Sequence, residues 1–158
     1  MADKHQQALK TFETICAMLD AREWKYDRDD ENMRIVCRVS GEDLPVDVLF
    51  LVREKHQVVT LLSPLPFKMA EDKRVDGALA VAVANYGLIN GTFDYDLRDG
   101  EIRFRMVSSF LESELNAELF AYMLICSVST VDDYNDKFMM LNKGLVTLEQ
   151  FIESEQQG

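Results

Sequence analysis

Cysteine, histidine, proline and cationic residues are all scarce in this 158-residue sequence. The three cysteines, Cys16, Cys37 and Cys126, are an odd number, and no C-x-x-C pair is present. That pattern excludes a disulfide framework and a cysteine zinc site. Each cysteine falls on an apolar position of a periodic segment, so we expect the thiols to be buried rather than reactive.

Long apolar runs and excess positive charge are missing as well. No window approaches the roughly 20 apolar residues that a bilayer span needs, and the polar start has no signal-peptide core. Lys and Arg total 17 against 28 Asp and Glu, a formal net charge of −11, which opposes binding to nucleic acid or anionic lipid. We therefore expect a cytoplasmic protein with neither partner, folded as one domain over residues 1–158.

The motifs that carry common enzyme chemistry are absent too. We find no G-x-S-x-G, G-x-x-x-x-G-K-[ST], G-x-G-x-x-G or H-E-x-x-H. His5 and His56 are too few for a histidine-rich metal centre. The acidic turn of residues 27–32 begins like a calcium loop, but Asn32 stands where glycine is needed and Arg38 where glutamate is needed. We expect no catalytic residue, no metal and no cofactor.

What is present is a series of periodic segments typical of an α+β domain. Apolar spacings of three and four predict helices over residues 5–22, over 70–86 and from 113 onward. The second helix is predicted to turn these side chains inward: Val75, Leu79, Ala82, Val83 and Tyr86. Alternating residues predict strands over 24–27, 33–40, 46–53 and 57–63. A capping box at residues 147–150 opens a short last helix.

Turn residues define the connections between these segments. The run 63–67 contains two prolines, which lack a backbone donor, so it is predicted to link the fourth strand to the second helix. Asp99 and Gly100 favour a two-residue hairpin turn, which would place Asp96 opposite Arg103 and Asp94 opposite Arg105. The predicted fold is an antiparallel sheet of five to six strands with flanking helices, in the order α-β-β-β-β-α-β-β-α-α.

The central hairpin is apolar on both faces. One face carries Val46, Val48, Phe50, Val52, Val59 and Leu61, and the other carries Leu49, Leu51, Val58 and Leu62. A strand that is apolar on both faces must be covered on both. The second face is covered either by the chain's own last helices or by a twin subunit or bound segment. Leu65 and Phe67 could extend such a surface.

One further polar stretch, residues 132–137, indicates a solvated helix face, on which Asp133 and Lys137 are spaced to form an ion pair.

Five stretches together resemble a known family: SPLPF (63–67), EDKR (71–74), NYGL (85–88), GTFDYD (91–96) and TVDDYNDKF (130–138). The chain resembles the YbjN-type family of bacterial sensory transduction regulators, whose fold is similar to that of type III secretion chaperones. The resemblance covers roughly residues 33–155. It implies that fold and a dimer that holds extended segments of a partner, and it supplies no catalytic residues to carry over.

The sequence thus favours a non-catalytic interaction module, a homodimer that binds a protein segment as a chaperone-like or regulatory adaptor would. The candidate partner-binding residues are Leu49, Leu51, Val58, Leu62, Leu65 and Phe67. The alternative is a small-molecule-sensing domain with its ligand between sheet and helices, near Tyr95, Arg103, Arg105 and Phe67. Only a sensor should gain thermal stability from a small metabolite.

Overall fold

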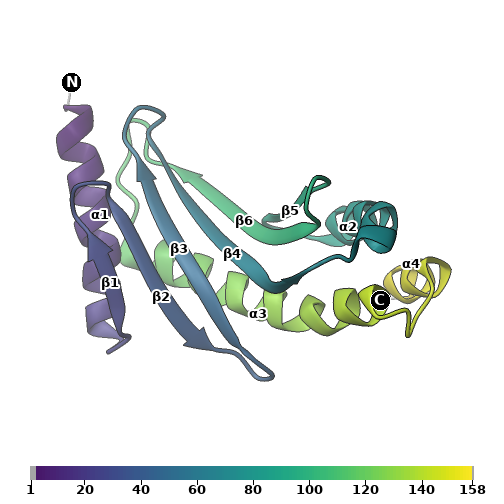
Figure 1. Cartoon of the computed structure of the whole chain (residues 1–158). Coiled ribbons are helices and arrows are strands. Elements are labelled where there is room, and N and C mark those ends of the chain that lie inside the picture. Colours follow the sequence, from purple (N-terminus) through teal and green to yellow (C-terminus); the bar gives the residue numbers. More distant parts are fainter. Residues whose placement is uncertain (1–2, 158) are drawn as a thin grey trace.

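The computed structural model describes residues 3–157, and at its centre is an antiparallel sheet of strand order β1-β2-β3-β4-β6-β5 (Figure 1). The strands are β1 (Tyr26–Asp29), β2 (Arg34–Ser40), β3 (Pro45–Arg53), β4 (Val58–Lys68), β5 (Thr92–Asp96) and β6 (Glu101–Ser109). The predicted α+β fold is confirmed, with the order of helices and strands expected from the sequence.

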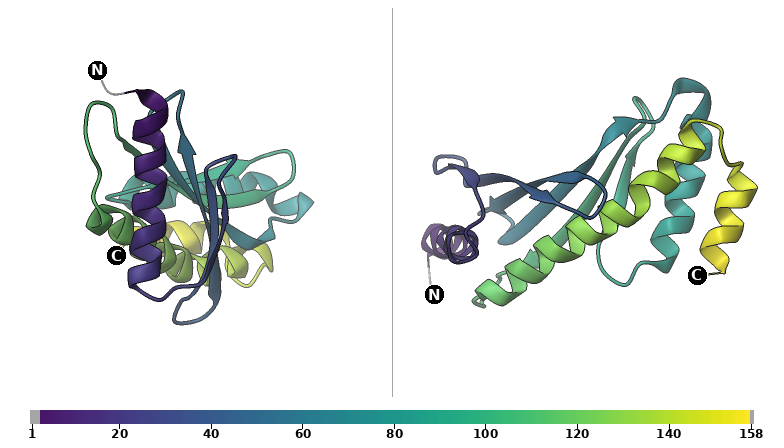
Figure 2. Two further views of the ribbon diagram at one scale, coloured as in Figure 1. Left: turned by 90° about the vertical axis from the view of Figure 1, so that its left-hand side faces the viewer. Right: turned by 90° about the horizontal axis from the view of Figure 1, so that it is seen from below.

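The helices all lie to one side or beyond the ends of this sheet. They are α1 (Lys4–Ala21), α2 (Arg74–Gly87), α3 (Ala117–Asn142) and α4 (Leu148–Gln156), with a 3₁₀ turn η1 (Glu71–Lys73) before α2. Figure 2 shows α3 running along one face of the sheet, with α1 at one end and α2 and α4 at the other. Over residues 3–157, no helix covers the opposite face.

The core fills the space between α1, α3 and the face of the sheet that they cover. Side chains that alternate along β3 and β4 point into it: Val46, Val48, Phe50, Val52, Val59 and Leu61 are at most 6% exposed. Phe12 and Leu19 of α1 and Phe120 and Leu124 of α3 pack in the same cluster. Burying each such side chain contributes about 1.5–3 kcal/mol, so this face accounts for much of the stability.

The proline run is part of β4 rather than a connection, which corrects the sequence prediction. β4 extends through residues 63–67 to Lys68, with an irregular register against β6 between Pro64 and Lys68. β3 pairs with β4 only as far as Leu62, so both prolines lie where β4 has one neighbouring strand. Prolines are tolerated at such edges because the missing donor breaks no ladder bond there.

The register of the β5–β6 hairpin is also not the predicted one. Asp94 lies opposite Arg103 and Asp96 opposite Glu101, two residues away from the expected pairing. The loop contains four residues, 97–100, because the Gly100 N–H donates to the Asp96 carbonyl at 2.7 Å and the Gly100 carbonyl accepts from Met69 at 2.9 Å. Since side chains alternate with a period of two, the shift leaves each strand residue on its predicted face.

The face of helix α2 that points inward is opposite to the predicted one. Its buried residues are Gly77, Ala80, Val81 and Ala84, whereas Val75, Leu79 and Tyr86 are 69, 49 and 95% exposed. Of the five side chains expected to point inward, Val83 alone packs against the core. The small residues let α2 approach β5 closely: a Cβ added at Gly77 would lie 2.7 Å from the Tyr95 hydroxyl.

Helix α3 begins at Ala117 rather than near residue 113, because the Asn116 side chain caps it by accepting from the Leu119 N–H at 3.0 Å.

Lys137 of α3 pairs with Glu155 of α4 at 2.9 Å, not with Asp133. The capping box of Thr147 and Gln150 that opens α4 is confirmed.

Candidate functional site

The uncovered face of the sheet carries a contiguous group of apolar side chains. Val36, Leu49 and Leu62 lie side by side on β2, β3 and β4, and in the next row Leu51 and Val107 lie on either side of the buried Thr60. We call these five aliphatic residues the apolar patch, and the face that carries them the open face. Val36 and Val107 are 45 and 48% exposed, Leu49 and Leu51 are half-buried, and Leu62 is 9% exposed. None of the five belongs to the core cluster.

The predicted partner-binding residues divide between the two faces. Leu49, Leu51 and Leu62 belong to the patch. Val58 lies on the same face of the sheet, next to the β3–β4 turn and opposite Arg53. Leu65 is 6% exposed and belongs to the core, and Phe67 packs against the core. The corner at residues 65–67 therefore does not extend the patch, because the alternation along β4 turns Leu65 to the helix side.

Sequence reasoning missed Val36 and Val107. Val36 stands between Arg34 and Arg38 on a strand whose outer face looked wholly polar. Val107 precedes two serines near the end of β6. The signal that could have found Val36 is its register opposite Leu49, which no single-strand pattern contains.

Arginines border the patch on both sides. On β6, the Nε atoms of Arg103 and Arg105 donate to the same Asp94 oxygen at 3.1 and 2.9 Å, and Arg105 adds a second bond at 3.1 Å to the other oxygen. On β3, the Arg53 Nε donates to the Thr60 hydroxyl at 3.1 Å. Arg34 of β2 lies next to Leu51.

The patch is hollowed at the end nearer to the β2–β3 turn. A depression with a volume of about 280 Å³ is lined by apolar groups of Val36, Leu49, Leu62 and Pro64, with Asp47, Glu101 and Arg103 at its border. An apolar floor with charged side chains at the rim is the usual make-up of a surface that receives a protein segment.

The residues of the alternative small-molecule site do not come together between sheet and helices. The Tyr95 hydroxyl donates to the Arg74 carbonyl at 2.7 Å, so it faces α2. Arg103 and Arg105 point to the open face, because they pair with Asp94 there. Tyr95 and Arg103 both line a depression of about 400 Å³ near the β5–β6 loop, together with Asp94, Asp96, Arg98 and Glu101.

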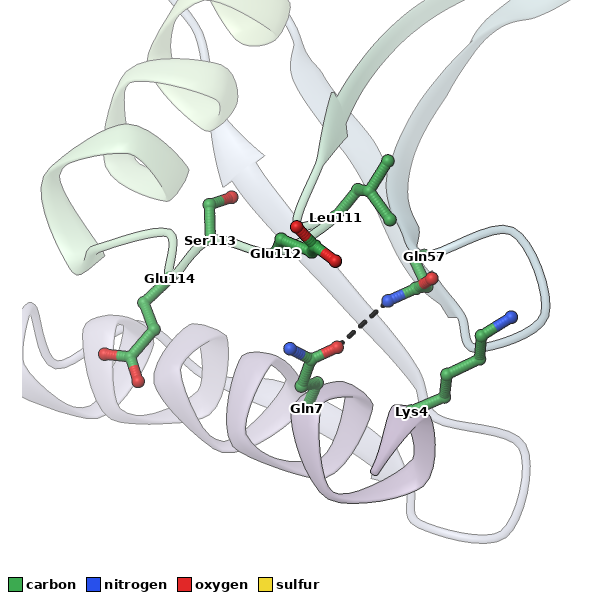
Figure 3. Close-up of a pocket in the computed structure, with 7 residues that line it drawn as sticks. All are labelled: Lys4, Gln7, Gln57, Leu111, Glu112, Ser113 and Glu114. Atoms are coloured by element: carbon green, nitrogen blue, oxygen red, sulfur yellow. Dashed lines mark hydrogen bonds between the residues drawn. The ribbon is translucent and has the colours of Figure 1, made fainter. Parts of the chain in front are cut away.

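A second hollow lies between α1 and the segment that leads into α3 (Figure 3). Gln57 donates to the Gln7 side chain across it at 2.9 Å, and Lys4, Glu112 and Glu114 line its border. Figure 3 shows that Gln7 and Gln57 bridge α1 and the β3–β4 turn, and that the Ser113 hydroxyl points away from the Glu114 carboxylate.

Two of the three thiols are buried, and His5 lies at the surface. Cys16 and Cys37 are buried, and burial raises the pKa of the Cys37 thiol to about 11. His5 contacts Glu54 at 3.0 Å at the surface, where the hydrogen bond raises the pKa of its imidazole. Between residues 3 and 157, no three His, Cys, Asp or Glu side chains cluster as metal ligands, and no helix is long and apolar enough to cross a bilayer.

Solved structures share this fold at low sequence identity. A chain of the HopA1–SchA chaperone–effector complex has a TM-score of 0.60 and 11% identity, over 86% of this chain and 99% of that one. E. coli YbjN has a TM-score of 0.58 and 12% identity, over 76% and 86%. A chain of the ExsC–ExsE complex has a TM-score of 0.58 and 14% identity, over 80% and 92%. The fold is therefore chaperone-like, as the resemblance implied.

Sequence comparison gives the family directly. Among curated proteins, none matches the sequence. Residues 11–140 match the family model described as "YbjN: Putative bacterial sensory transduction regulator". Because that match covers most of the chain, the protein belongs to the YbjN family.

Proposed function

We propose that the chain is a cytoplasmic, non-catalytic protein-binding module that holds a segment of a partner protein on its open face. The observation that carries this proposal is the apolar patch, which the described helices leave uncovered. Contiguous apolar surface of this kind on a soluble domain marks an interaction site. The occurrence of the same fold in a chaperone–effector complex supports a protein as the ligand.

A charged side chain in the patch tests this proposal. We expect the wild-type protein to retain members of a displayed random-peptide library, and Leu49→Asp to lose them, because the aspartate must be desolvated on binding. Val107→Asp, at a position 48% exposed, is a second variant with less effect on folding. The control is Leu145→Asp, at a position 68% exposed in the loop before α4. Retention that survives both patch variants would contradict the proposal.

We further propose that the protein is a homodimer joined through the outer face of α2. Val75, Leu79, Ala82 and Tyr86 follow one another at spacings of four, three and four, and all are exposed. This alternation aligns the four side chains along one seam, the spacing with which two helices pack together. A second copy offers the same seam, so the contact satisfies two-fold symmetry.

Light scattering across micromolar concentrations tests the dimer. Twice the chain mass of 18.1 kDa is expected for the wild type and a single chain mass for Leu79→Glu, with Leu145→Glu as the control that stays dimeric. A wild type that is monomeric throughout would refute the dimer. A metabolite screen by thermal shift addresses the alternative of a small-molecule sensor, since only a sensor is stabilised by a metabolite.

A further inference from the structure

Four arginines lie beside the patch of a chain that is strongly acidic as a whole. The whole protein has a formal net charge of −11. Yet Arg34, Arg53, Arg103 and Arg105 all project from the open face, next to the patch residues in the strand register. Charges farther from the patch than the Debye length of about 8 Å are screened at physiological salt. Asp27 lies opposite Val36 in the strand register, and Asp47 and Glu101 line the depression, so the excess positive charge is confined to the surroundings of Arg53, Arg103 and Arg105.

These arginines are short of carboxylate partners. Arg103 and Arg105 share the single carboxylate of Asp94, so the three groups together carry one excess positive charge. In the described residues, Arg53 forms no ion pair and bonds the neutral Thr60 hydroxyl. Arg34 also forms no ion pair within 4 Å, but it lies opposite Asp29 of β1. Side chains of Arg103 and Arg105 are 41 and 39% exposed, so their remaining N–H donors can be reached from solvent.

We infer that the segment bound on the open face is acidic and amphipathic, with apolar side chains on the patch and Asp or Glu side chains on the bordering arginines. This inference rests on the proposed binding function and adds the chemistry of the partner. A guanidinium presents a planar fork of donors that matches a carboxylate, and a pair of charged groups makes the stronger kind of hydrogen bond. The patch supplies binding energy, and Arg103 and Arg105 select for carboxylates.

Three synthetic peptides with the same apolar residues test the selection. Glutamate, glutamine or lysine fills the positions between the apolar ones, and fluorescence anisotropy gives the Kd of each peptide for the full chain. The glutamate peptide should bind tightest, and its affinity should fall as salt rises from about 50 to 500 mM. Arg103→Gln and Arg105→Gln should each weaken it by about fivefold, and leave the glutamine peptide unchanged.

The control is Arg22→Gln, which removes the same charge from an exposed residue at the end of α1, on the helix side of the sheet. Equal binding of the three peptides, abolished by Leu49→Asp, would overturn the acidic preference and leave the binding function standing. Tightest binding of the lysine peptide would also overturn the inference, as would a glutamate preference that survives both arginine variants. Binding of none of the three would count against the inference and the proposed function together.

Discussion

Asp132 is a buried carboxylate in α3, although its surroundings in the sequence predicted a solvated helix face. It is 7% exposed and accepts from the backbone N–H groups of Glu42, Asp43 and Leu44 at 2.8, 3.1 and 3.3 Å. Gly41 permits this approach, because a Cβ there would lie 2.9 Å from the carboxylate. One side chain of α3 thus fixes the β2–β3 turn.

Removing that charge should destabilise the protein. Asp132→Asn replaces one acceptor oxygen by a donor that faces backbone N–H groups, and we expect a loss of about 1–3 kcal/mol in the free energy of unfolding. Urea denaturation measures it. Asp133→Asn, at the exposed neighbouring position, is the matched control and should change the free energy by less than about 0.5 kcal/mol. Equal effects of the two substitutions would contradict this role of Asp132.

The Cys37 thiol should make the free energy of unfolding depend on pH in the alkaline range. Burial, with a smaller contribution from Asp47, raises the pKa of its thiol from 9.0 to about 11. A group whose pKa is raised by folding stabilises the folded state below its unfolded pKa, and this contribution is lost as pH rises toward the folded value. The free energy of unfolding should therefore fall between pH 9 and pH 11, less steeply in Cys37→Ala. Parallel pH curves would contradict this.

At the scale of elements, Asn85 of α2 covers the edge of β5. Its side chain accepts from the Phe93 N–H at 2.7 Å and donates to the Phe93 carbonyl at 3.0 Å, as a neighbouring strand would. Unpaired strand edges invite pairing with other chains. The bonds from Asn85 therefore close this edge of the sheet and hold α2 against it.

Asn85→Ala should expose that edge. Because Phe93 is 2% exposed, its two backbone groups would lose their partners in a buried setting, at a cost of about 1–3 kcal/mol in unfolding free energy. Chemical denaturation and light scattering would report the lost stability and any new association. The control Gln6→Ala removes an amide from an exposed position in the first turn of α1. A neutral Asn85→Ala would show that packing alone holds α2.

The sequence predicted the helices and strands better than it predicted the orientation of each one in the fold. Helix α1, the strands and the α4 capping box follow from local periodicity and capping residues. The face of α2 did not, because Gly77 and Ala80 carry little hydrophobic signal, although both are buried and Gly77 lies against Tyr95 of β5. The hairpin register failed for a similar reason: Gly100 is bonded to Met69, which no local turn rule includes.

At the scale of the whole molecule, the two proposed contacts occupy different parts of the fold. The patch is centred on β3 and β4, whereas α2 lies beyond β5 at the far edge of the sheet (Figure 1). The two contacts should therefore be energetically independent. A monomeric Leu79→Glu variant should bind the glutamate peptide with the wild-type Kd, and the wild-type dimer should bind two peptides. Calorimetry gives both quantities; one peptide per dimer would contradict this arrangement.

The sequence by itself determined the class of fold, the helix and strand order and the two-faced apolar hairpin, because these depend on spacings within one segment. Only the tertiary structure decided which face stays open, since that depends on α1 and α3 both packing on the same side. It also decided which candidate residues lie together. Leu65 belongs to the core and Val36 belongs to the patch, because neighbours on a sheet come from strands far apart in the chain.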